Sequence, residues 1–412
     1  MSKGKYQFDQ LVASLPSVYP STVLESLERL AKAGRITPLV LEKALEYVKQ
    51  ERVGPITSSH EIRLPVPHPL DYDWRFCDAS AERLLEIVLA STREEDCITF
   101  LGAPTVVRKA IELGFPRQLV LLDSNLVTLE PLRKAAANVK TVLCNLLCDP
   151  LPSFEAKMII IDPPWYEEYI DCFLWAAGQL CASKGKVLAS LPPVGTRPGM
   201  ENEWIRILDK AKYLGFTLSK LERGVLPYVS PPFERNALKA AGINTYLGHW
   251  RRGDLVEFTL SARNSVVAPP SILSYSLDWD EEVCCGVRIR VNNSSRESDF
   301  LNPCLISVIP GDILPSVSRR DKRRYLAKVW TSGNRIFACK GTTTFRYILE
   351  ALAANRSPEK TLVERFGRSL TENEKHLAVH TSTQIAAIID LEVKENSEYM
   401  EEYGAQLEFV SH

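Results

Sequence analysis

The sequence predicts an α/β protein whose largest domain is a doubly wound, mostly parallel β-sheet. Between residue 79 and about residue 260, short apolar runs alternate with segments of roughly ten to fifteen residues whose apolar side chains recur at helical spacing. The apolar runs are continuous, which is typical of strands that helices cover on both faces. Helical and proline-rich stretches flank this segment, so we expect smaller modules at both ends of the chain.

The elements expected in the main domain, residues 79–265, follow one another in regular order. Helices are expected at residues 79–90, 106–113, 126–137, 167–181 and 202–214. Strands are expected at residues 97–102, 118–123, 141–144, 157–162, 185–190, 216–221 and 245–250, with a turn at 250–254 before the last strand. Ligands of doubly wound sheets bind beyond the carboxyl ends of the strands, so the residues after these strands are the first site candidates.

Residues 1–55 are expected to form a small helical module. The apolar spacing predicts helices at residues 8–14, from residue 21, and at 38–49. The order helix, turn, helix resembles a winged-helix module, in which Arg29, Lys32 and Arg35 would face phosphates. A helical cap on the next domain or a dimerisation surface fits the same pattern, and acidic residues on the exposed face weaken the DNA-binding interpretation.

Residues 56–78 connect this module to the sheet domain and are rich in proline and aromatic residues. Asp73 and Trp74 stand at the end of the segment, and exposed aromatics beside charges suit stacking and hydrogen bonding of a planar ligand. Both are therefore candidate substrate-binding residues. The same pattern fits equally well if Trp74 and Phe76 only anchor the segment to the core.

The composition of the chain excludes some classes of function. The 412 residues include 50 basic and 51 acidic ones, a formal net charge of -1, which argues against coating nucleic acid by bulk electrostatics. No apolar run is long enough to span a membrane and the first residues lack a secretory signal, so we expect a cytoplasmic protein. The ten cysteines are scattered and expected to be reduced, and no Cys or His grouping has the spacing of a metal site.

Four successive expected strands end in residues that could form a site. Gly102 ends the first strand, Asp123 ends the second, and Asn145 follows the third. The fourth ends in Asp162-Pro163-Pro164-Trp165. The carboxyl ends of parallel strands meet at one edge of a sheet, so these residues are expected on one rim. Alternatively, Asp162 caps the following helix, whose first turn is acidic.

The motif Asp162-Pro163-Pro164-Trp165 and the order of elements over roughly residues 79–225 resemble the class I S-adenosylmethionine-dependent methyltransferases. Among these, the amino-methyltransferases of nucleic acids carry Asp or Asn, two prolines and an aromatic residue after the fourth strand. The resemblance implies a Rossmann-like fold and methyl transfer to an exocyclic amine, with a nucleic-acid base as the expected substrate. It also implies that Asp162 and the carbonyl of Pro163 accept hydrogen bonds from the amine while Trp165 stacks on the base.

The same resemblance implies a site for S-adenosylmethionine. Gly102 would lie against the cofactor and Asp123 would accept hydrogen bonds from its ribose hydroxyls. Asn145 and Leu146 would lie near its adenine. Ala103-Pro104 departs from the glycine-rich turn that normally follows the first strand, because proline has no N–H and fills space. A second interpretation therefore stays open, that of a methyltransferase-fold protein that has lost catalysis and serves as a binding or assembly component.

A second resemblance is to the branched-chain polyamine synthases, aminopropyltransferases of the same fold. The winged-helix-like start, the Leu101-Gly102 strand end and the Asp-Pro-Pro loop carry it. It implies a small amine as substrate and decarboxylated S-adenosylmethionine as donor. These enzymes typically carry a run of aspartates after the first strand to hold a polycation, and residues 102–105 contain none.

Three further residues are candidates for substrate binding. Tyr166 directly follows Trp165, Arg197 lies in a proline-rich loop, and Phe233 lies in a second such loop. Both loops follow strands of the same sheet, so they are expected to form rims that recognise the target.

The sequence pattern in the last third of the chain predicts two further modules. Residues 266–340 are expected to be β-rich, with strands at 287–291, 304–309, 328–331 and 335–340. Residues 341–412 are expected to be helical, at 345–353, 357–366 and 372–389. The basic residues at 318–324 fit either a contact to nucleic acid or another anionic partner, or a solvated loop. The terminal modules would dock protein partners, and an oligomer is compatible with them.

Overall fold

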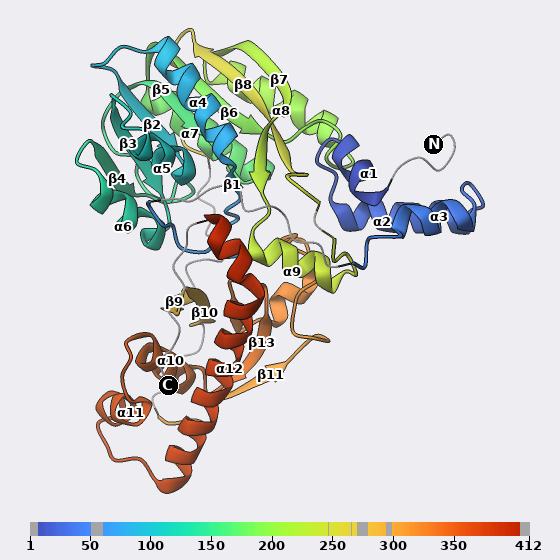
Figure 1. Cartoon of the computed structure of the whole chain (residues 1–412). Helices are drawn as coiled ribbons and strands as arrows, with labels where there is room; N and C mark the ends of the chain where they lie inside the picture. The colour runs from blue at the N-terminus through green and yellow to red at the C-terminus, as the bar shows by residue number, and fades with distance from the viewer. Residues whose placement is uncertain are drawn as a thin grey trace. The chain divides into compact units, whose positions relative to one another are not determined.

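The computed structural model of the protein describes residues 7–50, 61–245, 247–264, 266–269, 279–293 and 299–403. The chain forms two compact units (Figure 1). The first comprises residues 1–54, 74–230 and 244–274, and the second comprises residues 55–73, 231–243 and 275–412. No helix in the described ranges is both long and apolar enough to cross a membrane.

The first unit is built on an eight-stranded sheet with the order β1-β7-β8-β6-β5-β2-β3-β4. The strands are β1 (Arg75–Phe76), β2 (Cys97–Leu101), β3 (Gln118–Asp123), β4 (Val139–Leu143), β5 (Ala156–Ile161), β6 (Cys181–Leu191), β7 (Phe216–Val229) and β8 (Arg252–Leu260). The pairs from β4 across to β6 are parallel, whereas β8 pairs antiparallel with both β6 and β7 and β1 pairs antiparallel with β7. The predicted fold class, a mostly parallel α/β sheet, is confirmed.

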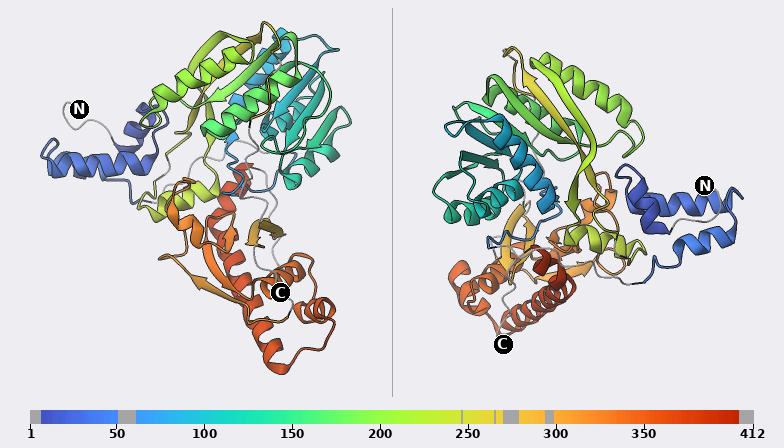
Figure 2. Two further views of the ribbon diagram at one scale, coloured as in Figure 1. Left: turned by 180° about the vertical axis from the view of Figure 1, so that it is seen from behind. Right: turned by 45° about the horizontal axis from the view of Figure 1, so that its top comes forward.

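Helices cover both faces of this sheet (Figures 1 and 2). One face carries α4 (Asp78–Ser91), α5 (Pro104–Glu112) and α6 (Leu126–Ala135), and the other carries α7 (Glu167–Leu180) and α8 (Met200–Tyr213). This double cover explains why β5 is apolar along its length, since Met158 to Ile161 are at most 1 % exposed. The side chains of Ile159 and Ile161 belong to a core that includes the inner faces of α7 and α8.

Three helices precede the sheet: α1 (Phe8–Ser14), α2 (Pro20–Lys32) and α3 (Pro38–Leu45). Within residues 7–50 no strand follows them, so this part of the chain contains no wing. The turn between α1 and α2 packs on the sheet domain. There the Ser17 hydroxyl both accepts from the backbone N–H and donates to the carbonyl of Arg252, each at 2.8 Å. Pro16 accepts a hydrogen bond from the Thr196 hydroxyl at 3.2 Å. These contacts agree with the alternative interpretation of residues 1–55, a helical cap that packs on the sheet domain.

The second unit contains an antiparallel sheet with the order β11-β13-β12-β10-β9. Its elements are α9 (Pro232–Ala240), β9 (Trp279–Cys284), β10 (Val287–Asn292), β11 (Cys304–Ser307), the 3₁₀ helix η2 (Lys322–Leu326), β12 (Val329–Thr331), β13 (Ile336–Lys340), α10 (Thr342–Ala353), α11 (Pro358–Phe366) and α12 (Glu372–Tyr403). Buried side chains of the sheet and of α10, α11 and α12 share one hydrophobic core. The strands and the helices at the end of the chain therefore fold together.

Two of the expected elements differ from the structure. The strand expected at 245–250 is wrong: in the part of this segment that is described, the backbone forms a loop, with Thr245 donating to the carbonyl of Val48 and Trp250 packed edge-on against Tyr19. The turn expected at 250–254 is strand from Arg252 onward. Strand β9 was not predicted, because its three successive acidic residues interrupt the alternation of apolar and polar residues that is typical of a strand.

Candidate functional site

The residues expected at the strand ends do lie along one rim of the sheet. Gly102 donates its backbone N–H to the carbonyl of Leu122 at 3.0 Å, which joins the ends of β2 and β3. Asp162 donates its backbone N–H to the carbonyl of Leu101 at 3.1 Å, which joins the ends of β5 and β2. Cys144, just before Asn145, bonds in the same way to the carbonyl of Asp123. Parallel pairing thus brings these four chain segments to one edge.

Asp162 is held by a buried tyrosine. The Tyr228 hydroxyl, on β7, donates to the Asp162 Oδ1 at 2.5 Å and lies 2.5 Å from the Ser190 hydroxyl at the end of β6. Both Tyr228 and Ser190 are 2 % exposed, whereas Asp162 is only half-buried. Burial and the neighbouring Asp162 carboxylate hold the pKa of Tyr228 well above its ordinary value, so the phenol stays a donor. The hydrogen bond fixes one carboxylate oxygen at the rim.

Aromatic rings surround this carboxylate. Tyr228 stacks on Phe76 with ring centres 4.6 Å apart and meets Trp165 edge to face at 5.8 Å. The guanidinium of Arg251 lies 5.0 Å from the ring centre of Trp165 and 4.3 Å from that of Trp74. These distances are within the range of cation–π attraction. Trp165 therefore lies beside Asp162 as expected, and Arg251 already covers part of its stacking surface.

The turn after β2 is closely packed. Gly102 adopts φ +64°, a conformation that favours glycine, and a Cβ at this position would lie 3.1 Å from the Phe173 ring and 3.4 Å from the carbonyl oxygen of Asp162. Pro104 is the first residue of α5, where a backbone N–H has no partner within the helix. The proline therefore begins α5 instead of disrupting it, and its ring is buried. Glycine is needed here because two neighbouring elements approach its Cα.

The expected cofactor residues next to this turn form ordered loops. The Asp123 Oδ1 accepts the backbone N–H of Asn125 at 2.8 Å, and Asn125 in turn caps α6. The loop at Asn145 is held by a hydrogen bond from the Asn145 backbone N–H to the Asp149 Oδ2 at 2.8 Å. Leu146 is 8 % exposed and packs into the core. Asp123, Asn145 and Leu146 thus stand in ordered loops next to Gly102, and their contacts to a cofactor stay predictions.

The candidate rim residues have different environments. Tyr166 is the residue before α7, and its carbonyl accepts the first N–H groups of that helix. Arg197 is bound by Glu203 of α8 through two hydrogen bonds, at 3.3 and 2.5 Å, so its guanidinium is held in the first unit by an acid. Phe233 and Asp73 belong to the second unit, where Phe233 is fully buried in α9. Substrate contacts of all these residues stay predictions.

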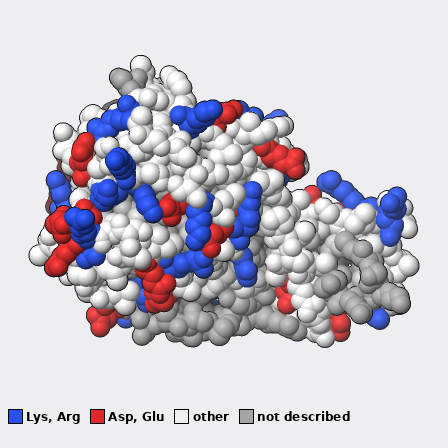
Figure 3. All heavy atoms as spheres, turned by 90° about the horizontal axis from the view of Figure 1, so that it is seen from above, with Lys and Arg blue, Asp and Glu red and all other residues white. Residues whose placement is uncertain are grey.

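The acidic start of α7 is balanced by bases on α8. Glu167 accepts two hydrogen bonds from Arg206, at 2.5 and 2.8 Å, and this contact lowers the pKa of Glu167. Asp171 lies 4.0 Å from the Lys210 ammonium. Acids and bases are also interspersed on the face shown in Figure 3. The acidic sequence after Trp165 therefore does not leave an uncompensated negative surface.

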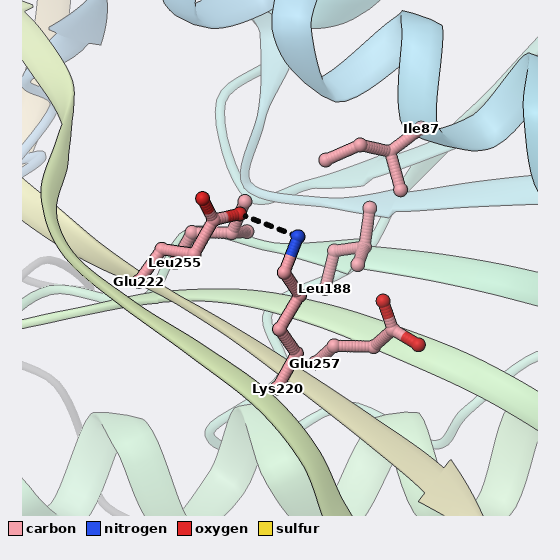
Figure 4. A pocket seen from close by; sticks show the side chains of 6 residues that line it. All are labelled: Ile87, Leu188, Lys220, Glu222, Leu255 and Glu257. Atoms are coloured by element: carbon pink, nitrogen blue, oxygen red, sulfur yellow. Dashed lines mark ion pairs between the residues drawn. The ribbon is translucent and has the colours of Figure 1, made fainter.

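No group of three or more metal-binding side chains occurs among the residues that the structure describes. Burial raises the pKa of Cys144 to about 11 and that of Cys181 to about 12, which makes these thiols inert. A small hollow is lined by Ile87 of α4, Leu188 of β6, Leu255 of β8 and charged residues of β7 and β8 (Figure 4). Lys220 and Glu222 in it form an ion pair at 3.1 Å. The rim remains the candidate site.

Comparisons with solved structures support the fold. The branched-chain polyamine synthase C9 mutein from Thermus thermophilus, solved with N4-aminopropylspermidine and 5'-methylthioadenosine, matches with a TM-score of 0.50 and 14% sequence identity. The match covers 65% of this chain and 86% of the synthase. The chain has the fold of the S-adenosylmethionine-dependent transferases.

Another match is to a putative RNA methyltransferase from Pyrococcus horikoshii, at 13% identity and a TM-score of 0.34, over 50% of this chain and 94% of that one. No protein-family model and no curated protein matches the sequence. The likeness therefore concerns the fold, and the chemistry has to be argued from the site.

Three residues of the site were not predicted from the sequence. Tyr228 and Ser190 hold Asp162, and Arg251 contacts Trp165. The sequence did contain one indication that Ser190 could belong to the site, because Ser190 is a polar residue that follows an apolar run at the end of a strand. Tyr228 and Arg251 carried no such signal, because only the antiparallel pairing of β7 and β8 brings them to the rim.

Proposed function

We propose that this protein transfers a methyl group from S-adenosylmethionine to an exocyclic amine, with a nucleic-acid base as the substrate class. The observation that carries the proposal is the fixed carboxylate of Asp162. It stands at the end of β5 beside Trp165, with one oxygen bound by Tyr228, on the rim that also holds Gly102 and Asp123. An acceptor held in place next to an aromatic ring is what an amine of low nucleophilicity requires.

The residues of the rim fit the cofactor. Gly102 has no side chain to stand between the turn after β2 and a bound cofactor, and Asp123 ends the neighbouring strand with a carboxylate that would accept from ribose hydroxyls. Asn145 and Leu146 would flank the adenine. When bound, S-adenosylmethionine supplies an electrophilic methyl group on a positively charged sulfur.

The chain's own residues would orient the amine. Asp162 and the carbonyl of Pro163 accept its N–H groups, which turns the nitrogen lone pair toward the methyl carbon. Methyl transfer from bound S-adenosylmethionine would form the N–C bond at the expense of the S–C bond, whose electron pair would stay on the sulfur. The nitrogen then carries an extra proton, which Asp162 is placed to accept or to pass to water. Trp165 and Arg251 would position the planar part of the substrate.

Calorimetric titration with S-adenosylmethionine tests the cofactor site. We expect binding in the micromolar range and its loss in Asp123→Ala. Asp96→Ala is the matched control, because Asp96 also accepts a backbone N–H, that of Arg93 at 2.7 Å, but at the start of β2. No heat at millimolar cofactor, or equal loss in both variants, would contradict the proposal.

Methyl incorporation tests the reaction. With radiolabelled S-adenosylmethionine and single-stranded RNA or DNA, we expect incorporation by the wild type and a loss of about a hundredfold or more in Asp162→Ala, with cofactor binding retained. Cofactor binding without incorporation into any nucleic acid or amine would favour the binding-protein interpretation.

Aminopropyl transfer to a polyamine is the second candidate. The match to the branched-chain polyamine synthase supports it. Against it, no run of aspartates follows β2, and Arg251 places a positive charge at Trp165, where a polycation would be repelled. Replacing S-adenosylmethionine by its decarboxylated form, with spermidine as acceptor, distinguishes the two. Turnover only with the decarboxylated donor would establish aminopropyl transfer.

A further inference from the structure

The second unit carries a strongly basic segment that the proposed reaction does not use. Residues 319–324 contain five cations and one acid, and Tyr325 and Leu326 follow directly. We call residues 318–326 the basic turn. It lies between Val317, which is buried, and β12, and its last residues form η2.

The basic turn is anchored at two points. The Asp321 side chain accepts the backbone N–H of Arg323 at 3.0 Å and also binds the Arg323 guanidinium, at 3.0 and 2.6 Å. Arg324 lies over the Trp330 ring at 4.4 Å and donates to the carbonyl of Val317 at 3.4 Å. Trp330 belongs to a small core with Leu314 and Ile336. The segment is thus ordered by its own acid and by the core below it.

This anchoring leaves a defined set of side chains at the surface. Arg320, Lys322 and Arg323 are exposed, and within the described residues Arg320 and Lys322 form no ion pair. Tyr325 is 70 % exposed and Leu326 is 48 % exposed. The side chain of Asp321, the one acid of the turn, is 12 % exposed and is already bound to Arg323. The surface therefore presents positive charge together with one large planar ring.

We propose that the basic turn binds the sugar–phosphate backbone of a single-stranded nucleic acid, with Tyr325 stacking on a base. Guanidinium and ammonium groups neutralise phosphates, and an exposed aromatic ring among them provides a stacking face that accepts any base. A membrane surface fits less well, because Leu326 is the one exposed aliphatic side chain within residues 318–326, and an acidic protein would make no use of an exposed ring. The inference does not depend on the proposed methyl transfer.

Fluorescence anisotropy with a labelled oligonucleotide of about 20 nucleotides, in RNA and DNA form, tests this binding in the full chain without cofactor. In Arg320→Glu/Lys322→Glu we expect affinity to fall at least about tenfold, and the slope of log K against log salt to fall by about 1.4. Tyr325→Ala should weaken binding about fivefold or more, whereas Tyr325→Phe, which keeps the ring, should restore it.

The matched control is Arg356→Glu/Lys360→Glu, which makes the same change of charge at exposed positions beside α11. It should bind within about twofold of the wild type if the basic turn is the site. Equal loss in both double variants would show that only overall charge matters and would overturn the proposal. No binding by the wild type at about 50 mM salt, or binding of polyglutamate or anionic vesicles in preference to the oligonucleotide, would overturn it as well.

Discussion

The Tyr228 hydroxyl donates to the Asp162 Oδ1 at 2.5 Å, from a strand 66 residues further along the chain. The contact joins β7, in the antiparallel part of the sheet, to the end of β5 in its parallel part. Asp162 thereby has a fixed oxygen, and the orientation of its carboxylate does not depend on a bound substrate. In the proposed reaction, Tyr228 would be a positioning residue that acts through Asp162.

Tyr228→Phe tests this role. The ring and its stacking on Phe76 are retained, but Asp162 loses its donor, so we expect kcat to fall about tenfold with little change in cofactor affinity. The control is Tyr213→Phe, at a tyrosine that is 62 % exposed, which should leave the rate unchanged. An unaltered kcat in Tyr228→Phe would show that Asp162 does not need this hydrogen bond.

The pH dependence of the wild type follows from the same contact. Because the pKa of Tyr228 lies well above its ordinary value of 10.0, the folded protein keeps the phenol protonated at pH values where a free tyrosine ionises. The rate should therefore show no alkaline decrease from this group below about pH 10. Above that pH the unfolded chain loses the proton first, so stability should decline, more steeply in the wild type than in Tyr228→Phe.

Gly102→Ala tests the close packing of the turn after β2. The new Cβ would strain a left-handed residue and press on Phe173 at 3.1 Å. Gly114→Ala is the matched control, since Gly114 has φ +59° and nothing within 4 Å of the added Cβ. Both variants should lose about 1 kcal/mol from backbone strain. Gly102→Ala should lose more stability than this because its Cβ also presses on Phe173, and it alone should lose cofactor binding. Equal cofactor affinity in the two variants would remove Gly102 from the site.

The sequence predicted the rim because each of its residues ends a continuous apolar run, and parallel strands end at the same edge. Asp123 and Asp162 could therefore be placed without coordinates. The strand expected at 245–250 failed because aromatic residues such as Trp250 also pack in loops, here against Tyr19. The partners of Asp162 and Trp165 could not be found, since antiparallel pairing of β7 and β8 decides which distant residues meet.

Arg251→Ala tests the contact between the guanidinium and the tryptophans. Arg251 lies within 5.3 Å of the ring centres of Trp74, Trp165 and Trp250, and each such contact contributes about 0.5–1 kcal/mol. We expect the free energy of unfolding in urea to fall by about 1.5–3 kcal/mol. The neighbouring Arg252→Ala should change it by less than about 0.5 kcal/mol, because the Arg252 side chain is exposed. Similar losses in both variants would contradict the cation–π account.

A buried histidine in the second unit predicts sensitivity to acid. His68 is fully buried, its Nδ1 lies 3.2 Å from the backbone N–H of Leu70, and its Nε2 lies 3.1 Å from the carbonyl of Trp330. In this arrangement the neutral ring accepts at Nδ1 and donates at Nε2. Burial, reinforced by Arg290 and Arg288, holds the pKa of His68 well below 6.5, although Asp71 opposes this effect. The folded protein therefore keeps the ring neutral.

The unfolded chain takes up a proton at His68 as the pH falls below about 6.5, while the folded protein does not. Stability is complete above that pH and is lost as the pH falls, by up to about 1.4 kcal/mol per unit until the folded pKa is reached. Urea unfolding at about pH 7.5 and about pH 5.5 measures the loss. In His68→Gln the protein should be less stable at the higher pH, but most of the difference between the two pH values should disappear. The exposed His380→Gln should keep the full difference, and a His68→Gln variant that also keeps it would assign the acid sensitivity to other groups.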